Sequence, residues 1–196
     1  MALRPLPVPA EGWEGMKGNV TLYRSRTSLP PSHLRQGHVP SRHVLFDRWN
    51  EIRWILANVL HDDATRCVGG GKWKRVDMAM AAIRLQATRG QCFASAKYLA
   101  SHGFASEKTW DRCLARLRSL CLVWTERLYR PDGSQSVNLT DFSMLWALIL
   151  RLLNSRNIQF TQLSNGLWLK QGGVWLHLMD CLDAWFPVPG PPLEGP

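Results

Sequence analysis

The sequence has no long hydrophobic run. In its apolar C-terminal part, the longest stretches without a charged residue are 142–150 and 171–179, nine residues each, whereas a bilayer-spanning helix needs roughly 20. Proline at positions 5, 7 and 9 interrupts the N-terminal stretch where a secretory signal would need an apolar core. We therefore expect no membrane segment and a soluble, cytoplasmic, nucleoid-associated protein.

The cysteines are few and irregularly spaced. The chain has five cysteines, an odd number, and no two of them are spaced as Cys-x-x-Cys. A disulfide framework and a zinc-finger site both need regular spacing. We expect buried thiols in a reducing compartment, with no metal and no cofactor. The cysteines are Cys67, Cys92, Cys113, Cys121 and Cys181.

Proline is nearly absent from the middle of the chain. Of twelve prolines, only Pro131 falls between residues 45 and 186. Because proline interrupts both helices and sheets, the folded unit is expected over 45–186. The predicted organisation is a basic Pro/Gly-rich arm (1–44), a helical lead-in with a helix-turn-helix and hairpin (45–140), an apolar Trp-rich helix/β interaction element (141–186) and a Pro-rich tail (187–196).

Acidic residues are in the minority. Twenty-four Lys and Arg outweigh fifteen Asp and Glu, giving a net charge of +9. The excess lies in the first 140 residues, because residues 141–196 carry three basic and four acidic side chains. A basic protein of this kind favours a polyanionic partner, and nucleic acid is the first candidate. The arm has too few apolar residues for a core of its own, although 20–23 could add a strand to another sheet.

Hydrophobic periodicity predicts an α+β, mainly helical fold. Asp-Gly after proline is typical of a tight hairpin turn, so residues 131–134 are expected to connect two strands. The predicted helices are 45–61, 73–88, 95–101, 106–120, 142–153 and 179–186, and the predicted strands are 122–129, 135–140, 158–163, 167–170 and 174–178.

The predicted helix 106–120 is strongly amphipathic. Ser106 stands at its N-cap position, where a hydroxyl accepts a backbone N–H. One apolar stripe, expected to pack, comprises Trp110, Cys113, Leu114, Leu117 and Leu120. The opposite side is polar and basic, and it comprises Glu107, Lys108, Asp111, Arg112, Ala115, Arg116 and Ser119. Small and basic residues on a free helix face suit base edges and phosphates in a major groove.

Residues 93–140 resemble the winged helix-turn-helix domains of bacterial transcription regulators and plasmid replication initiators. The run Ser106-Glu107-Lys108-Thr109-Trp110 is similar to the start of their recognition helix, and Leu120-Cys121-Leu122 to its exit. Cys121 stands where that family has a glycine in left-handed conformation. The resemblance implies that Ser106, Lys108, Thr109, Arg112 and Arg116 face DNA.

Further basic residues flank this helix. Arg127 and Arg130 border the hairpin turn, which would be the wing, and would lie near the DNA backbone or minor groove. Lys72, Lys74 and Arg75 precede the helix 73–88 and are expected to contact phosphates. Together these residues predict a non-catalytic protein that binds duplex DNA.

Ten tryptophans are unusual for this length. We expect Trp49, Trp54, Trp73, Trp110, Trp124 and Trp146 to lie mostly in the core. Trp168, Trp175 and Trp185 fall in the uncharged C-terminal part, where a partner surface would cover them. The chain is therefore expected to form a homodimer or a hetero-oligomer.

Enzyme motifs are weak. His61-Asp62-Asp63 lacks a second cluster at metal-ligand spacing, and Arg66 replaces the first glycine of a phosphate-binding loop. Two other non-enzymatic hypotheses stay open besides a regulator or initiator. One is a DNA-contacting subunit of a larger nucleoprotein assembly, such as an RNA-guided effector or transposition complex with RNA or protein subunits. The other is a winged-helix protein-docking adaptor.

Overall fold

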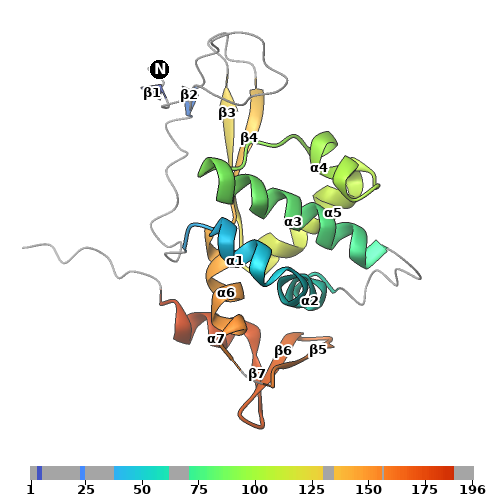
Figure 1. The fold of residues 1–196 in the computed structure, drawn as a ribbon, viewed down its shortest axis with the longest axis vertical. Helices are drawn as coiled ribbons and strands as arrows, with labels where there is room; N and C mark the ends of the chain where they lie inside the picture. Colours follow the sequence, from blue (N-terminus) through green and yellow to red (C-terminus); the bar gives the residue numbers. More distant parts are fainter. Residues whose placement is uncertain are drawn as a thin grey trace, which may run out of the picture.

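A computed structural model describes residues 4–5, 23–24, 38–61, 71–129, 135–155 and 157–187. Within these ranges the fold is α+β and mainly helical, with seven helices and two small antiparallel sheets. The sheets lie at opposite ends of the helical body (Figure 1). The helices are α1 (Arg42–Asp47), α2 (Trp49–Val59), α3 (Gly71–Arg89), α4 (Ala96–His102), α5 (Glu107–Ser119), α6 (Ser143–Leu153) and α7 (Leu178–Trp185).

The two sheets are separate in sequence and in space. The first has the order β1-β2-β3-β4 and the second has the order β5-β6-β7. Within the first, Tyr23 of β2 pairs with Tyr129 of β3, so a short piece of the basic arm adds a strand to the hairpin. The strands are β1 (Arg4–Pro5), β2 (Tyr23–Arg24), β3 (Trp124–Tyr129), β4 (Gln135–Asp141), β5 (Gln159–Leu163), β6 (Gly166–Gln171) and β7 (Val174–His177).

The predicted order of elements from α3 to β4 is found in the structure. Each boundary lies within two residues of its predicted position. The structure adds a β-bridge between Cys92, in the segment joining α3 to α4, and Thr140 of β4. There the Thr140 amide donates to the Cys92 carbonyl at 2.9 Å. The predicted turn 131–134 lies outside the described residues.

The prediction of one helix over 45–61 is wrong. The structure has two helices that break at Arg48, whose φ and ψ are −113° and 28°. The Arg48 guanidinium binds Glu51 one turn later and the Leu153 carbonyl of α6 at 3.3 Å. The break lets Leu45 and Ile52 both reach the core with no exposure, while Phe46 stays 45% exposed.

One hydrophobic core runs from α1 to α7 and crosses the predicted boundary at residue 140. Helix α6 contributes seven buried residues out of eleven to this core, among them the fully buried Trp146. Burying apolar area on this scale is the main stabilising contribution to a fold. None of the described helices is long and apolar enough to span a bilayer.

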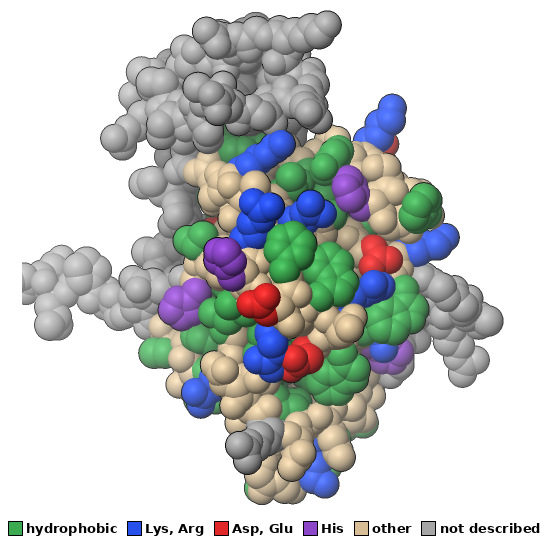
Figure 2. Space-filling model, viewed as in Figure 1, with side chains coloured by type: hydrophobic (Ala, Val, Ile, Leu, Met, Phe, Trp, Pro, Cys, Tyr) green, Lys and Arg blue, Asp and Glu red, His purple; other side chains and the backbone are tan. Residues whose placement is uncertain are grey.

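Two tryptophans predicted for the core lie on the surface. Trp54 is 47% and Trp73 48% exposed, whereas Trp110 and Trp146 are buried as predicted. The face that carries α1–α3 shows aromatic and basic side chains intermixed (Figure 2). The Arg53 guanidinium lies 5.3 Å from the Trp73 ring centroid. This cation–π contact stabilises the ring at the surface.

A buried glutamine ties the hairpin to the helices. The Gln86 side chain of α3 donates to Asp141 Oδ1 at 2.9 Å and accepts from the Phe142 amide at 2.7 Å. The same Asp141 oxygen accepts from the Ser143 amide at the start of α6. Buried polar groups that are fully paired rigidify a structure, so α3, the end of β4 and the start of α6 form one unit.

Thiol reactivity is expected to follow burial. Burial raises the pKa of the Cys92 thiol to about 11 and that of Cys113 to about 12, so both stay protonated at neutral pH, and only a thiolate reacts fast. In a Cys67→Ser variant at pH 7.5, iodoacetamide should label the exposed Cys121 first. Mass spectrometry of peptides would check this. Equal labelling of Cys113 in the native protein would contradict the buried placement of α5.

Candidate nucleic-acid interface

The turn between α4 and α5 presses against α3. A Cβ atom added to Gly103 would lie 2.5 Å from the Lys74 carbonyl oxygen and 2.8 Å from Met78 Cγ. The Ala105 amide donates to the Ala100 carbonyl at 3.0 Å, which closes the turn. Only a residue without a side chain allows this approach, so Gly103 sets how α4 and α5 sit on α3.

Helix α5 begins as predicted, but its cap differs. Ser106 occupies the N-cap position and is exposed, yet its hydroxyl makes no bond to the helix backbone. It lies 3.1 Å from Thr109 Oγ1 instead, so the predicted hydroxyl cap is wrong. At the other end, Cys121 has φ 54°. This left-handed conformation, at a position where the resembled family has glycine, directs the chain into β3.

Apart from Arg116, the two sides of α5 divide as the sequence predicts. Trp110, Cys113, Leu114 and Leu117 are buried. Lys108 and Arg112 are exposed, as their predicted role requires, while Thr109 is half-buried. Sequence reasoning missed Arg118, which is also exposed. Helical spacing could have found it, because residue 118 follows Ala115 by three positions and Asp111 by seven.

A polar groove of about 620 Å³ separates α5 from the hairpin. Arg118 lines it from α5, and Arg127 lines it from β3 with its cross-strand neighbour Asn138 on β4. Arg127 is exposed, as predicted for a residue near the wing. The remaining lining residues are Ala94, Ser95, Ala96, Trp110, Asp111, Leu114, Thr125 and Thr140.

Arg116 does not belong to the free face of α5. Its Nε donates to the Val59 carbonyl at 3.2 Å, and its terminal nitrogen donates to Gln162 Oε1 at 2.8 Å. These contacts hold α5 against the end of α2 and against β5. The expectation that Arg116 faces DNA is therefore not supported, because the guanidinium is already committed to protein acceptors.

Arg116→Ala is accordingly expected to affect stability rather than DNA affinity. Losing two hydrogen bonds from a charged, half-buried donor should lower the free energy of unfolding by about 2 kcal/mol. Urea denaturation followed by circular dichroism would measure this. Duplex affinity at 10 °C should change less than twofold. A large loss of affinity in a fully folded variant would restore Arg116 to the interface.

The three basic residues at the start of α3 differ in accessibility. Lys74 is exposed and Lys72 is half-buried, so both can reach a phosphate. Arg75 is only 4% exposed and its carbonyl faces the Cys113 thiol of α5 at 3.9 Å. The expected phosphate contact of Arg75 is therefore not supported. Arg130 lies outside the described residues.

Phe104 is the most exposed large apolar side chain described for this region. It is 89% exposed and has φ 48°, a left-handed conformation that is unusual for a bulky residue. It lies three residues before the start of α5. Sequence reasoning noted the turn but missed this side chain.

The three tryptophans predicted to contact a partner differ in the structure. Trp168 donates to Asn165 Oδ1 at 3.0 Å and packs edge-on against His177. Trp185 is half-buried with Arg151 5.3 Å from its ring centroid. Both rings thus have neighbours within the chain. Trp175 has Lys170 Nζ 5.8 Å from its ring centroid, but it is 42% exposed on β7 and remains a candidate for a partner contact.

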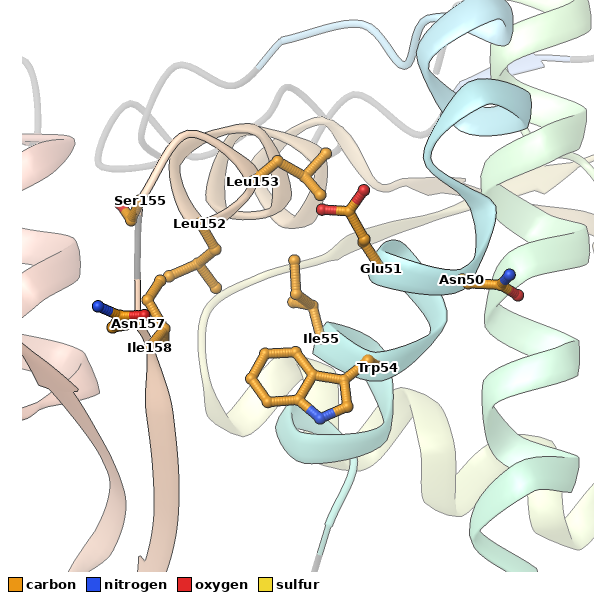
Figure 3. A pocket seen from close by; sticks show the side chains of 9 residues that line it. All are labelled: Asn50, Glu51, Trp54, Ile55, Leu152, Leu153, Ser155, Asn157 and Ile158. Carbon is orange, nitrogen blue, oxygen red and sulfur yellow. The ribbon is translucent and has the colours of Figure 1, made fainter.

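A second concavity, of about 420 Å³, lies between α2, α6 and the start of β5 (Figure 3). Trp54 from α2 and Leu152 and Ile158 from the other side line it. Glu51 stands at its edge, and the hydrogen bonds it accepts from Arg48 lower the pKa of its carboxyl. The carboxylate is thus held as an ion-pair partner beside an apolar groove.

His61, at the end of α2, lies at the border of the described residues, and Asp62 and Asp63 lie outside them. Over the described ranges, no group of three His, Cys, Asp or Glu side chains is placed to hold a metal ion. The chain matches no known protein-family model, no curated protein and no solved structure.

Proposed function

We propose that this protein binds duplex DNA, without catalysing a reaction on it, through a winged helix-turn-helix formed by residues 71–141. In this proposal α5 is the recognition helix and enters the major groove. The β3–β4 hairpin is the wing and follows the adjacent backbone. The exposed basic side of α5 beside an open polar groove is the observation that carries the proposal.

The order and pairing of the elements support this assignment. Helix α3 leads through the bridge at Cys92 to α4, a tight turn, α5 and the hairpin. The bridge to Thr140 places the segment before α4 along the side of β4 that faces away from β3. An antiparallel hairpin after a helix-turn-helix is the arrangement expected of a winged helix, where the second helix reads the groove.

The charge of this surface also supports the proposal. The proposed surface takes in six of the eight exposed Lys and Arg side chains of α3, α4, α5 and β3, together with two exposed acidic side chains of α5. Lys and Arg at a free surface release counterions when they neutralise phosphates. The basic residues are Lys74, Lys97, Lys108, Arg112, Arg118 and Arg127, and the acidic residues are Glu107 and Asp111.

Individual roles follow from side-chain chemistry. Arg112 and Arg118 present planar guanidinium groups that can donate two parallel hydrogen bonds to a guanine edge. Ala115 lies between them on the exposed side, and its small size lets the helix backbone approach the bases. Lys74 and Arg127 lie on other elements and would contact phosphates, which position the protein without reading sequence.

Salt dependence of duplex binding tests the proposal. In a fluorescence anisotropy titration with a labelled duplex, the logarithm of the association constant should fall with the logarithm of the salt concentration with a slope near −5, from about six phosphate contacts at −0.9 each. A matched single strand should bind more weakly. Affinity that does not change with salt, or no binding at low salt, would contradict DNA recognition and favour a protein-docking adaptor.

A further inference from the structure

Strand β7 is an edge strand with an unusually apolar surface. Within the described residues it pairs with β6 alone. Val174, Trp175 and Leu176 are 59%, 42% and 37% exposed. Edge strands normally carry lysine, proline or a bulge that prevents pairing with another chain. The sequence Val-Trp-Leu-His contains none of these residues, so the edge is open to a further strand.

The turn before β7 determines which backbone groups face this edge. Gly172 and Gly173 have φ 60° and 87° and join the Gln171↔Val174 pair as a two-residue hairpin turn. Hydrogen-bonded and non-hydrogen-bonded pairs alternate along an antiparallel ladder. If the pair next to the turn is hydrogen-bonded, the next pair, Lys170↔Trp175, is not. The Trp175 amide and carbonyl then point away from β6.

We infer that β7 pairs antiparallel with β7 of a second copy of this chain, joining two three-stranded sheets into one sheet of six strands. In an antiparallel pair, directly opposite residues have their side chains on the same face of the sheet. Two copies related by a two-fold axis perpendicular to the sheet satisfy this only if one residue lies opposite its own copy, next to the axis. Centred on Trp175, this register pairs Trp175 with its copy and Val174 with Leu176 of the second chain.

Two features of this register favour a second copy over an unrelated segment, and the open turn is compatible with it. The register centred on Trp175 uses the amide and carbonyl that face outward, so each Trp175 both donates to and accepts from the other. The same register matches the two exposed aliphatic residues, Val174 and Leu176, on the opposite face. Nothing lies within 4 Å of a Cβ placed on Gly172 or Gly173, so the turn leaves room for the other chain.

The position of β7 is compatible with the proposed function but does not depend on it. The β5–β7 sheet lies at the end of the molecule opposite the β3–β4 hairpin (Figure 1). A dimer formed there leaves both copies of α5 accessible. A strand pair of four residues forms a small interface of the transient class, so the dimer should dissociate on dilution in the micromolar range.

Sedimentation equilibrium of the full chain from about 1 to 200 µM tests the interface. The expected mass rises with concentration from 22.3 kDa toward twice that value. Trp175→Lys places like charges at the two-fold axis and should keep the protein monomeric. Val39→Lys makes the same change at a side chain that is 67% exposed elsewhere and should still dimerise. A wild-type monomer at 200 µM, or a dimer unaffected by Trp175→Lys, would overturn the inference.

Cross-linking tests the register in a background with Cys67→Ser and Cys121→Ser. Paired residues in a hydrogen-bonded position have Cα atoms about 5.5 Å apart, within disulfide range, so oxidised Trp175→Cys should form a covalent dimer. In Val174→Cys the two thiols are offset by two residues, with Cα atoms roughly 8 Å apart, and this variant should not cross-link. Preferential cross-linking of Val174→Cys would refute the register. If the wild-type protein dimerises through β7 but does not bind a DNA duplex, the proposed function is refuted and the dimer interface is not.

Discussion

Replacing Arg112 and Arg118 together with alanine is expected to weaken duplex DNA binding about 30-fold, or ~2 kcal/mol. Both side chains are exposed on α5, and the double variant removes two donors that a groove-reading helix needs. Neither residue is part of the apolar stripe that packs α5 into the core. The fold and its thermal midpoint should therefore stay unchanged, and anisotropy titration at fixed salt would measure the loss.

A matched control removes the same charge elsewhere. Arg42 on α1 and Arg84 on α3 are both exposed, and both lie over the Phe46 ring, at 5.8 and 5.6 Å from its centroid. Arg42→Ala with Arg84→Ala should weaken binding by less than about threefold, which is the long-range effect of two lost charges. Equal losses in the two double variants would mean that binding follows net charge and not α5.

Gly103→Ala should destabilise the whole fold by about 3 kcal/mol, the upper part of the range for overpacking. The added methyl group would meet the Lys74 carbonyl oxygen at 2.5 Å, and a helix backbone cannot move aside as a side chain can. Relief requires α4 and α5 to shift away from α3. For a chain of this size the thermal midpoint should fall by about 6 to 12 °C, measurable by differential scanning calorimetry.

Gly90→Ala separates this steric effect from backbone strain. Gly90 has φ 75°, and nothing lies within 4 Å of an added Cβ atom. Its substitution should cost about 1 kcal/mol, which is the penalty for a left-handed alanine. If Gly103→Ala were no more destabilising than Gly90→Ala, the close contact between the α4–α5 turn and α3 would be wrong.

Local sequence patterns were sufficient to predict helix α5 and the hairpin. The stripe from Trp110 to Leu117 fixed which side of α5 packs, because apolar residues at three- and four-residue spacing share one face. The strands β5–β7 were also predicted, since Asn165-Gly166 and Gly172-Gly173 mark their turns. These features depend on neighbours in the sequence.

Contacts between distant residues were not predictable in this way. Arg116 is basic and off the apolar stripe, but Val59 and Gln162 bind it from other elements. Arg75 is basic, as a phosphate contact should be, yet it is buried and its carbonyl lies against Cys113 of α5. Likewise the break at Arg48 depends on a carbonyl of α6, at Leu153. In each case the partner lies at least 38 residues away.

A cleavage probe placed on α5 tests the central claim most directly. Ala115→Cys, in the background with Cys67→Ser and Cys121→Ser, would carry a tethered iron–EDTA group on the exposed side of α5. Ala184→Cys would carry it on an exposed site of α7 as the matched control. The proposal predicts strong cleavage of a bound duplex from position 115 and none above background from position 184. Cleavage from position 184 alone, or equally from both positions, would contradict recognition of DNA by α5.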